Sequence, residues 1–431
     1  MSGPVIDLGE LRHGPDPDPI RLPRPPLARQ RPLRCALVLL LVLAGLAGSG
    51  PFNRREVLTL PAELGAEALV TDDLFVLVEP LGGTGQRRLT ATRLPGGEPA
   101  WQVPLPTEGR YWGVAQQGET LLVTGHEVGP DNQGTLTIAL DRRTGTYRWQ
   151  QPGNAAALPD GNLLMWSTAG DDQGDTLRGV DLCCGTVRWQ LPISPGGMFV
   201  LRDGEHGVDR LLVVRLRGST EVRDPTTGAV LARADLDAGG GASGVSVQLA
   251  DDLLLTIGGA TATTTAYGLD DLRQRWRVPA GEALYASDCG VVICVQTRSG
   301  GLRALDAATG RDLWASDRWG WVWPYAGRLV ATTVSSAGPG AEEIVVLDPP
   351  TGRVLAELGR WELAQFARGG PLIGVRRHPD GGLLVAELDV TGGRARTLDV
   401  LRDATGDCQA LTGRLLCRRR DNAYGLWRLP R

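Results

Sequence analysis

The side chains with the greatest chemical potential in this sequence are its seven cysteines. Cys408 and Cys417 flank Thr412-Gly413, which is typical of a two-residue hairpin turn. Counting outward from that turn places the two thiols opposite each other in a non-hydrogen-bonded pair, where cross-strand side chains approach most closely. Cys289 and Cys294 bracket a similar hairpin earlier in the chain. The sequence therefore predicts two disulfides in an oxidising compartment, with free buried thiols as the alternative.

Cys183 and Cys184 are adjacent in sequence and occupy a turn. They stand where Arg143 and Thr144 stand in a similar turn one unit earlier. We interpret them as a turn substitution or a structural link rather than as a redox centre.

Other catalytic chemistry is sparse. The histidines are isolated and lack the spacing of metal ligands, which is more consistent with surface or loop positions. They are His13, His126, His206 and His378. Every basic side chain other than histidine is arginine, which excludes an amine nucleophile, a Schiff base and a phosphate-loop lysine. The net charge of −4 gives no indication of a nucleic-acid partner. The sequence predicts no catalytic residue, no metal site, no cofactor-binding residue and no enzyme activity.

The element that organises the chain is a ten-residue stretch, Leu305 to Trp314. It reads as strand, tight turn and strand. Asp306 can accept hydrogen bonds from the turn amides, Gly310 can adopt a positive φ, and Leu313 with Trp314 restarts an apolar strand.

Degraded copies of this stretch recur along the chain. The Asp positions of the copies are Asp141, Asp181, Asp224, Asp270, Asp348 and Asp389, and a further weak copy runs from Gly97 to Trp101. We expect the copy at Asp270 to have a shortened turn without glycine. Where glycine is kept, it recurs at spacings of 40 to 48 residues, or twice that interval. We assign the tryptophans at matching positions to blade docking: Trp101, Trp149, Trp189, Trp276 and Trp314.

A period near forty with four strand-like runs per unit is typical of a β-propeller. The unit around Gly310 divides into strands at 283–287, 291–297, 302–306 and 312–316. Runs such as 211–214 and 253–257 are apolar on both faces, which suits blades packed between two neighbours. The predicted fold is all-β: an eight-bladed propeller, with seven to nine blades possible, of four-stranded antiparallel blades. A partial unit, Cys408 to Arg431, is expected to pair with Val57–Leu60 and close the ring. If this unit is counted as a separate blade, the ring has nine blades.

The Asp-x-x-Thr-Gly-x-x-x-Trp unit resembles the repeat of the PQQ-like, or quinoprotein-like, β-propeller family over residues 56–431. That family includes quinoprotein alcohol dehydrogenases and the cofactor-free propeller of the outer-membrane assembly machinery. The resemblance implies the fold and leaves function open, because most such repeats only dock blades. A PQQ enzyme of this kind needs calcium ligands, a catalytic Asp and a stacking Trp, and none of those motifs is matched. PQQ with calcium is therefore not expected.

The N-terminal region predicts a membrane connection. Residues 1–34 are rich in Pro, Asp and Arg and are expected to be a disordered cytoplasmic tail. Residues 35–52 form an uncharged apolar stretch that we interpret as a transmembrane signal anchor, with a cleaved signal peptide or a buried helix as alternatives. Both export readings place the propeller, residues 56–431, outside the cytoplasm. The absence of lysine resembles the codon bias of a high-GC bacterium of the actinobacterial type.

Topology predicts where a binding site lies. In a four-stranded meander, the long loops between strands two and three share one face with the blade crossovers. The candidate binding residues on that face are the aromatic residues Trp319, Trp321, Trp323, Tyr325, Tyr111 and Trp112 and the acidic residues Asp131, Asp171, Asp172 and Asp175. Aromatic side chains beside a propeller axis suit a peptide or a sugar, whereas packing at blade junctions is the alternative.

Three functional hypotheses follow. The first is a non-catalytic, membrane-tethered, extracytoplasmic scaffold that binds a protein or cell-envelope ligand. The others are a PQQ-dependent oxidoreductase and a sensor module that acts through a membrane partner. We favour the first.

Overall fold

The structure is a computed structural model that describes residues 56–430, except 64, 72, 82–85, 106–108, 128–133, 169–173, 216–218, 237–245, 259–262, 334–340, 365–369 and 380. Arg55–Arg431 form one compact unit. The predicted tail at 1–34 and the predicted anchor at 35–52 lie outside the described residues. Within the described part of the chain, no helix has the length and apolar character needed to cross a membrane.

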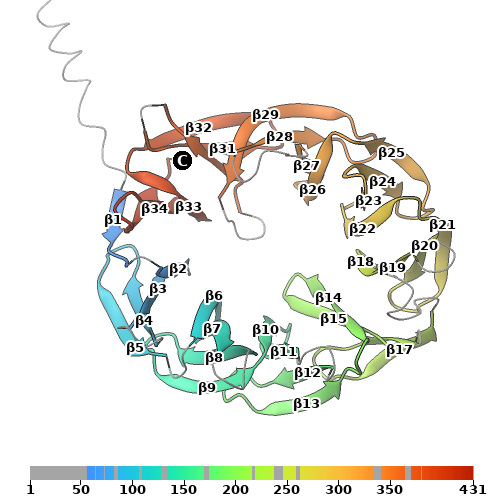
Figure 1. Ribbon diagram of the computed structural model, residues 1–431, viewed down its shortest axis with the longest axis horizontal. Helices are drawn as coiled ribbons and strands as arrows, with labels where there is room; N and C mark the ends of the chain where they lie inside the picture. Colours follow the sequence, from blue (N-terminus) through green and yellow to red (C-terminus); the bar gives the residue numbers. More distant parts are fainter. Residues whose placement is uncertain are drawn as a thin grey trace, which may run out of the picture. The chain divides into compact units, whose positions relative to one another are not determined.

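The described residues are all β, and their strands form eight antiparallel sheets arranged as a ring (Figure 1). The first sheet contains β2 to β5 (Glu67–Val70, Leu74–Pro80, Arg87–Arg93, Pro99–Pro104) and the second β6 to β9 (Gly109–Gln117, Thr120–Glu127, Thr135–Asp141, Tyr147–Pro152). The third contains β10 to β13 (Asn154–Ala157, Leu163–Thr168, Asp175–Val180, Val187–Pro192) and the fourth β14 to β17 (Met198–Gly204, Gly207–Val214, Ser219–Arg223, Val230–Asp235).

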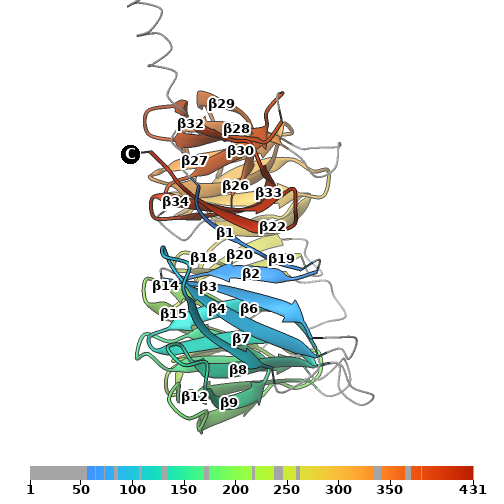
Figure 2. The same ribbon diagram turned by 90° about the vertical axis from the view of Figure 1, so that its left-hand side faces the viewer.

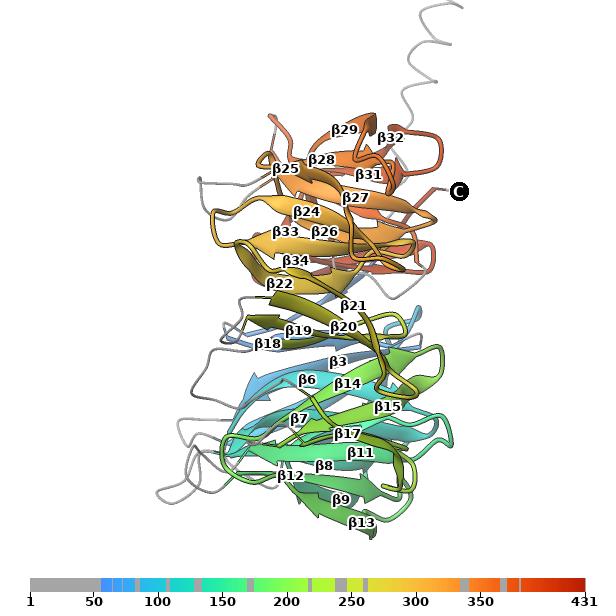
Figure 3. The same ribbon diagram turned by 90° about the vertical axis from the view of Figure 1, so that its right-hand side faces the viewer.

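The second half of the ring continues this pattern. The fifth sheet contains β18 to β21 (Ser246–Ala250, Leu253–Gly258, Thr263–Gly268, Gln274–Pro279) and the sixth β22 to β25 (Ala283–Asp288, Val292–Thr297, Leu302–Asp306, Asp312–Ser316). Figure 3 shows these two sheets next to each other. The seventh has seven strands, β26 to β32 (Trp319–Tyr325, Arg328–Thr333, Glu342–Leu347, Val354–Leu363, Ile373–Arg377, Leu383–Asp389, Arg394–Leu401).

The seven-stranded sheet contains two blades that share β29. The first part of this long strand pairs with β28, from Val354 opposite Leu347 to Trp361 opposite Glu342. Its last two residues pair instead with β30, Glu362 opposite Val375 and Leu363 opposite Gly374. Counted by blade rather than by sheet, the ring therefore has nine blades, the upper end of the predicted range. The predicted count of eight differs because one continuous strand serves two neighbouring blades.

The last sheet closes the ring with both ends of the compact unit. It contains β33, β34 and β35 (Ala404–Leu411, Arg414–Arg419, Tyr424–Arg428) with β1 (Glu56–Leu60) as its outermost strand. β1 pairs with β35, with Leu58 opposite Leu426 and Leu60 opposite Tyr424. Figure 2 shows this first strand alongside the final ones. The closure expected from the partial C-terminal unit is thus confirmed.

The central strands of the blades form the core. Leu211, Leu212 and Val213 on β15 are each 0% exposed, so both faces of this strand are covered by neighbouring blades. The strand bounds predicted around Gly310 agree with β22 to β25 to within one residue. The differences are Asp288, which belongs to β22, and Val291, which is 69% exposed and precedes β23.

The two faces of the ring differ in their connections. Turns between the first two and the last two strands of each blade lie on one face, here called the turn face. Loops between the second and third strands, together with the crossovers to the next blade, lie on the other, here called the loop face. Much of the loop face falls outside the described residues.

The repeated turns on the turn face are held by their aspartates. Asp141 Oδ1 accepts hydrogen bonds from the backbone N–H groups of Arg143 and Thr144 at 3.0 Å and from the Thr144 hydroxyl at 3.0 Å. Asp306 Oδ1 is bonded in the same way by the amide and hydroxyl of Thr309, at 2.8 and 2.7 Å. These contacts show the Asx-type turn that the repeat predicts.

Each repeated tryptophan reaches from the outermost strand of its blade into the turn of the next blade. The indole Nε1–H donates to a backbone carbonyl there in all five cases: Trp101 to Arg142 (2.8 Å), Trp149 to Leu182 (2.9 Å), Trp189 to Thr226 (3.0 Å), Trp276 to Ala307 (2.9 Å) and Trp314 to Pro349 (2.7 Å). The ring then lies over the turn glycine. A Cβ placed on Gly310 would come within 2.4 Å of the Trp276 ring.

At one junction both the turn residue and the residue it faces differ from the repeat. Where the preceding blade has Ala232 in place of tryptophan, the turn has Leu272 in place of glycine, at a φ of 51°. Leu272 is buried in the cluster against which Ala232 packs. At the ring closure, Leu58 of β1 takes the tryptophan position against Gly97.

This pairing corrects the interpretation of the Asp270 copy. Its turn is not shortened: Leu272 N donates to Gly268 O at 2.9 Å, the same connection that Gly310 N makes to Asp306 O. Gly268 holds the aspartate position and Leu272 the glycine position. The sequence pattern was misleading because Asp270 lies two residues after the position that the repeat reserves for aspartate.

The contribution of this contact can be separated from backbone conformation with two glycines. Gly310→Ala and Gly327→Ala both place a Cβ at φ near 70°, but nothing lies within 4 Å of the Gly327 Cβ position. We expect Gly327→Ala to lower the free energy of unfolding by about 1 kcal/mol from backbone strain. Gly310→Ala should cost about 1–3 kcal/mol more because the tryptophan must move.

Both free energies are measurable by urea unfolding of the purified protein, followed by intrinsic fluorescence and circular dichroism. Equal losses in the two variants would show that the indole contact contributes nothing beyond the turn geometry.

Candidate functional site

The structure divides the predicted aromatic binding residues into exposed and buried groups. Trp321 is 64% exposed and Trp112 is 41% exposed. Tyr111 and Trp319 are each 3% exposed and belong to hydrophobic clusters. These two residues are buried, although the sequence groups them with their exposed neighbours, and Tyr111 is among the residues that line a cavity described below.

β-Bulges explain why close neighbours in sequence have opposite exposure. In β26 the pairing shifts between Trp319 and Trp321, so these two side chains do not share a face as alternating strand residues do. In β6 a similar shift between Tyr111 and Gly113 bulges Trp112 out of the ladder. Trp112 stacks against His126, with ring centroids 4.3 Å apart.

Trp323 and Tyr325, at the end of β26, have packing roles. Both contact the cluster that contains Val330 and Trp361. Tyr325 also donates its hydroxyl hydrogen to the carbonyl oxygen of Gly370 at 2.9 Å. The Trp323 Nε1 is buried without a hydrogen-bond partner among the described residues.

An exposed apolar pair that the sequence analysis missed lies on the neighbouring innermost strand. Leu284 and Tyr285 on β22 are 51% and 45% exposed, and the pairing of this strand shifts at Leu284. β22 and β26 are the innermost strands of adjacent blades (Figure 1). We call Leu284, Tyr285 and Trp321 the inner-strand patch. The sequence indicates this pair by two consecutive large apolar residues in the first strand of a blade, where apolar and polar residues would otherwise alternate.

The predicted acidic residues contribute less. Asp131, Asp171 and Asp172 lie outside the described residues. Asp175 is half-buried at the start of β12, and its carbonyl oxygen accepts a hydrogen bond from Ile193 N at 2.8 Å. No group of three or more His, Cys, Asp or Glu in the described part of the chain is arranged to hold a metal ion.

A cavity of about 370 Å³ lies on the loop face, where the closing blade meets the first two blades of the chain. Its charged lining consists of Glu67, Arg87, Arg110 and Arg418, which come from four different strands. Arg110 Nε lies 3.9 Å from Glu67 Oε1. We call this cavity the closure pocket. Sequence reasoning could not find it, because its arginines are far apart in the chain and match no motif.

The predicted hairpin disulfides are present in the structure. Cys289 is bonded to Cys294 and Cys408 to Cys417. The hairpin register counted from Thr412-Gly413 holds as far as Gln409 opposite Leu416, after which the strand bulges.

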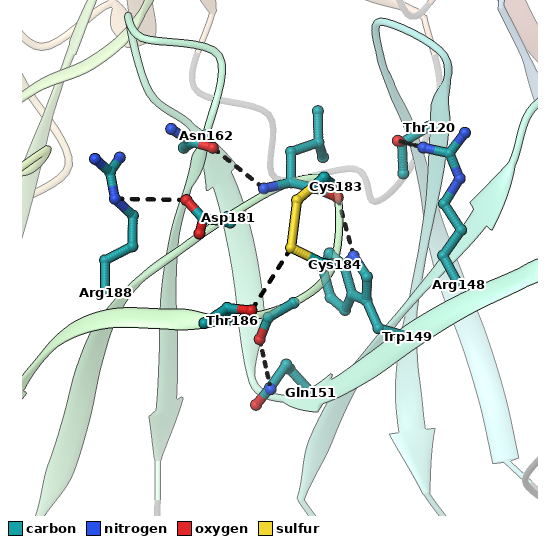
Figure 4. The surroundings of a disulfide bond; sticks show 12 residues. Thr120, Arg148, Trp149, Gln151, Asn162, Asp181, Cys183, Cys184, Thr186 and Arg188 are labelled. Carbon is teal, nitrogen blue, oxygen red and sulfur yellow. Dashed lines mark hydrogen bonds and ion pairs between the residues drawn. A yellow bond between two sulfur atoms is a disulfide. The ribbon is translucent and has the colours of Figure 1, made fainter.

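Cys183 and Cys184 are bonded to each other in the turn that follows β12 (Figure 4). The turn keeps both docking contacts to the preceding blade: Leu182 O accepts from Trp149 Nε1, and Gly185 O accepts from Gln151 Nε2 at 3.0 Å. Asp181 pairs with Arg188 at 3.4 Å. The bond joins two adjacent residues within the turn and leaves these contacts in place.

The most buried charge is structural. Glu221 on β16 has a side chain 2% exposed and is paired with Arg223 at 2.6 Å, Arg215 at 3.5 Å and Arg233. Burial by itself raises the pKa of this carboxyl group. The hydrogen bonds and charges of the arginines lower the pKa by more than burial raises it, so the pKa lies below its usual value. A carboxylate held this way remains ionised and is unsuited to proton transfer near neutral pH.

Comparison with known proteins agrees with the fold. A family model described as "Outer membrane protein assembly factor BamB" matches residues 85–223 and 216–368. No curated protein matches the chain.

Solved structures with a similar fold include three of different kinds. BamB from Moraxella catarrhalis is 14% identical, over 86% of this chain and 97% of that chain, with a TM-score of 0.42. The computationally designed Ika8 protein is 16% identical, over 74% of this chain and 96% of that chain, with a TM-score of 0.45. The quinohemoprotein alcohol dehydrogenase ADHIIG from Pseudomonas putida HK5 is 11% identical, over 68% and 71% of the two chains, with a TM-score of 0.37.

Proposed function

Because the chain belongs to the PQQ-like repeat family whose model is described as outer membrane protein assembly factor BamB, we propose that its propeller is a non-catalytic scaffold that binds a protein partner. The observation that carries this proposal is the exposure of aromatic side chains on innermost strands, with Trp321 64% exposed and Trp112 41% exposed. These side chains are separate from the tryptophans that dock the blades.

Exposed aromatic side chains on rigid strands are suited to protein recognition. Tryptophan and tyrosine provide a large contact area with few rotatable bonds, so ordering them on binding costs little entropy. Because β22 pairs with β23 along its length and β26 with β27, the inner-strand patch is presented without a large rearrangement. Its three side chains come from two adjacent blades, so a partner that spans both innermost strands can contact all three.

We further propose that the propeller is extracytoplasmic and tethered to a bacterial membrane by residues 35–52, with residues 1–34 in the cytoplasm. The uncharged run from Cys35 to Ser49, which follows several arginines, supports a signal anchor. The three disulfides support an oxidising compartment. No cofactor takes part in this proposal.

Partner binding is tested by site-specific photocrosslinking in intact cells. A benzoylphenylalanine at position 321 or 112 should give a discrete adduct with the same protein, identified by mass spectrometry. Tyr147, which is 49% exposed but lies on the outermost strand β9, is the matched control and should give none.

Trp321→Ala should abolish the adduct from position 112 while leaving the free energy of unfolding within about 0.5 kcal/mol of wild type. Trp323→Ala should instead cost about 3 kcal/mol, because its side chain packs in the core. Equal adducts from all three positions would show surface collisions rather than a partner site.

Membrane topology is tested by protease treatment of spheroplasts. The full-length chain should lose its propeller to external protease and retain a protected fragment that contains the N-terminal tail. A freely soluble propeller after osmotic release would indicate cleavage after the apolar segment, and full protection would place the propeller in the cytoplasm.

The competing hypothesis of a PQQ-dependent oxidoreductase makes an opposite prediction for cofactor binding. Titration of the purified protein with PQQ and Ca²⁺ should give no saturable change in absorbance and no calorimetric signal. Saturable binding near one equivalent would contradict the scaffold proposal and favour an oxidoreductase.

A further inference from the structure

The closure pocket lies where the closing blade, near the C-terminal end of the compact unit, meets the first blades of the chain. Arg418 comes from β34 in the closing blade, Glu67 and Arg87 come from the first blade of the chain, and Arg110 comes from β6 in the second. The charged residues of the lining are three arginines and one glutamate, in a chain whose net charge is −4, and Asp407 at the rim lies 3.9 Å from Arg418 Nε. A local excess of arginine in an acidic protein attracts an anion to that position.

Arg418 is held in place by its surroundings. Its Nη2 donates to Ala66 O at 2.9 Å and its Nη1 donates to Asn422 O at 3.0 Å. The guanidinium lies over the Tyr424 ring at 4.4 Å, and the side chain is only 19% exposed. Each Nη retains a second N–H, so the group is a preorganised donor that loses little freedom when an anion binds.

The other two arginines have capacity for a ligand. Arg87 is half-buried at the start of β4, and its side chain forms no ion pair or hydrogen bond with the described residues. Arg110 is 79% exposed, and its 3.9 Å contact with Glu67 is loose. Arginine forks match the two oxygens of a carboxylate in bidentate geometry, which lysine cannot reproduce.

Glu67 narrows the class of anion. Its negative charge opposes a dianion such as phosphate more strongly than a single carboxylate. Its oxygens can also accept a hydrogen bond from a backbone amide next to an acidic side chain. The volume of about 370 Å³ exceeds that of a single ion and lies at the lower end of the range for small-ligand sites.

From this arrangement we propose that the closure pocket binds an acidic peptide segment, with a carboxylate between Arg87, Arg110 and Arg418 and a neighbouring amide on Glu67. The proposal rests on the scaffold function above and extends it with a second, charged contact. A partner would present an acidic side chain to this pocket on the loop face as well as an apolar surface to the inner-strand patch.

The test measures binding of fluorescein-labelled tetraglutamate, amidated at its C-terminus, to the full-length protein by fluorescence anisotropy. Wild type should bind this probe saturably, bind the tetraglutamine analogue at least tenfold more weakly, and lose affinity as NaCl rises from 50 to 300 mM. Arg87→Gln with Arg110→Gln should weaken tetraglutamate binding at least tenfold. Arg110→Gln alone should weaken tetraglutamate binding less than the double variant does. This single variant still tests the pocket if the double variant proves unstable.

The matched control is Arg143→Gln with Arg311→Gln. Both residues are exposed in turns of the turn face, so the control removes the same charge from the opposite side of the ring. It should change the affinity less than twofold. An equal loss in the control would show nonspecific attraction by net charge and would overturn the pocket.

Inorganic phosphate distinguishes the ligand classes. Phosphate should displace tetraglutamate less effectively than glutarate does, and Glu67→Gln should reduce that preference. Displacement by phosphate at lower concentration than glutarate, or no saturable binding of tetraglutamate, would overturn the proposal. Persistence of the crosslink from position 321 in the same cells would then show that the scaffold function stands without this pocket.

Discussion

The contact that joins neighbouring blades at five junctions of the ring is the indole of one blade lying on the turn of the next. A single side chain supplies two interactions there: a hydrogen bond to a turn carbonyl, such as the 2.9 Å bond from Trp276 to Ala307, and a ring face covering the turn glycine. The glycine is required twice, by its positive φ and by the absence of a Cβ beneath the indole. At these five junctions each blade is therefore positioned by its neighbour.

The pairing of Leu272 with Ala232 shows that a larger turn residue can fill the space of a missing indole, although Gly393 is kept as glycine where the facing residue is Ala356. Leucine adopts a positive φ there at a cost of about 1 kcal/mol. Filling the space left by the missing indole offsets that cost, because an empty space of this size would lose more in packing. The same rule operates at the ring closure, where Leu58 covers Gly97. A family of imperfect repeats can thus form one closed ring.

The local repeat explains how much of this structure was predictable. The strand runs around Gly310, the Asp–Thr turn and the hairpin register from Leu411 to Gln409 follow from nearby residues, and the closing β1–β35 pair follows from the incomplete repeat unit at the end of the sequence. Exposure of individual aromatic residues did not follow, because the bulge between Trp319 and Trp321 depends on how β26 pairs with β27. The blade count depended on β29 crossing between two blades, and the closure pocket on arginines that only the closed ring brings together.

The docking contact also explains why the turn face serves stability and the other surfaces can serve binding. On the turn face, the repeated carbonyls and glycines are already used by neighbouring blades, so substitution there changes stability before it changes binding. Residues of the innermost strands and the loop face do not form these repeated docking contacts, so they can differ from blade to blade. The inner-strand patch and the closure pocket both lie on surfaces of this second kind. The inner-strand patch breaks the repeat with large apolar residues, and the closure pocket lies where the two ends of the unit meet. In a molecule built from copies, the places where the copies differ are where specific recognition can arise.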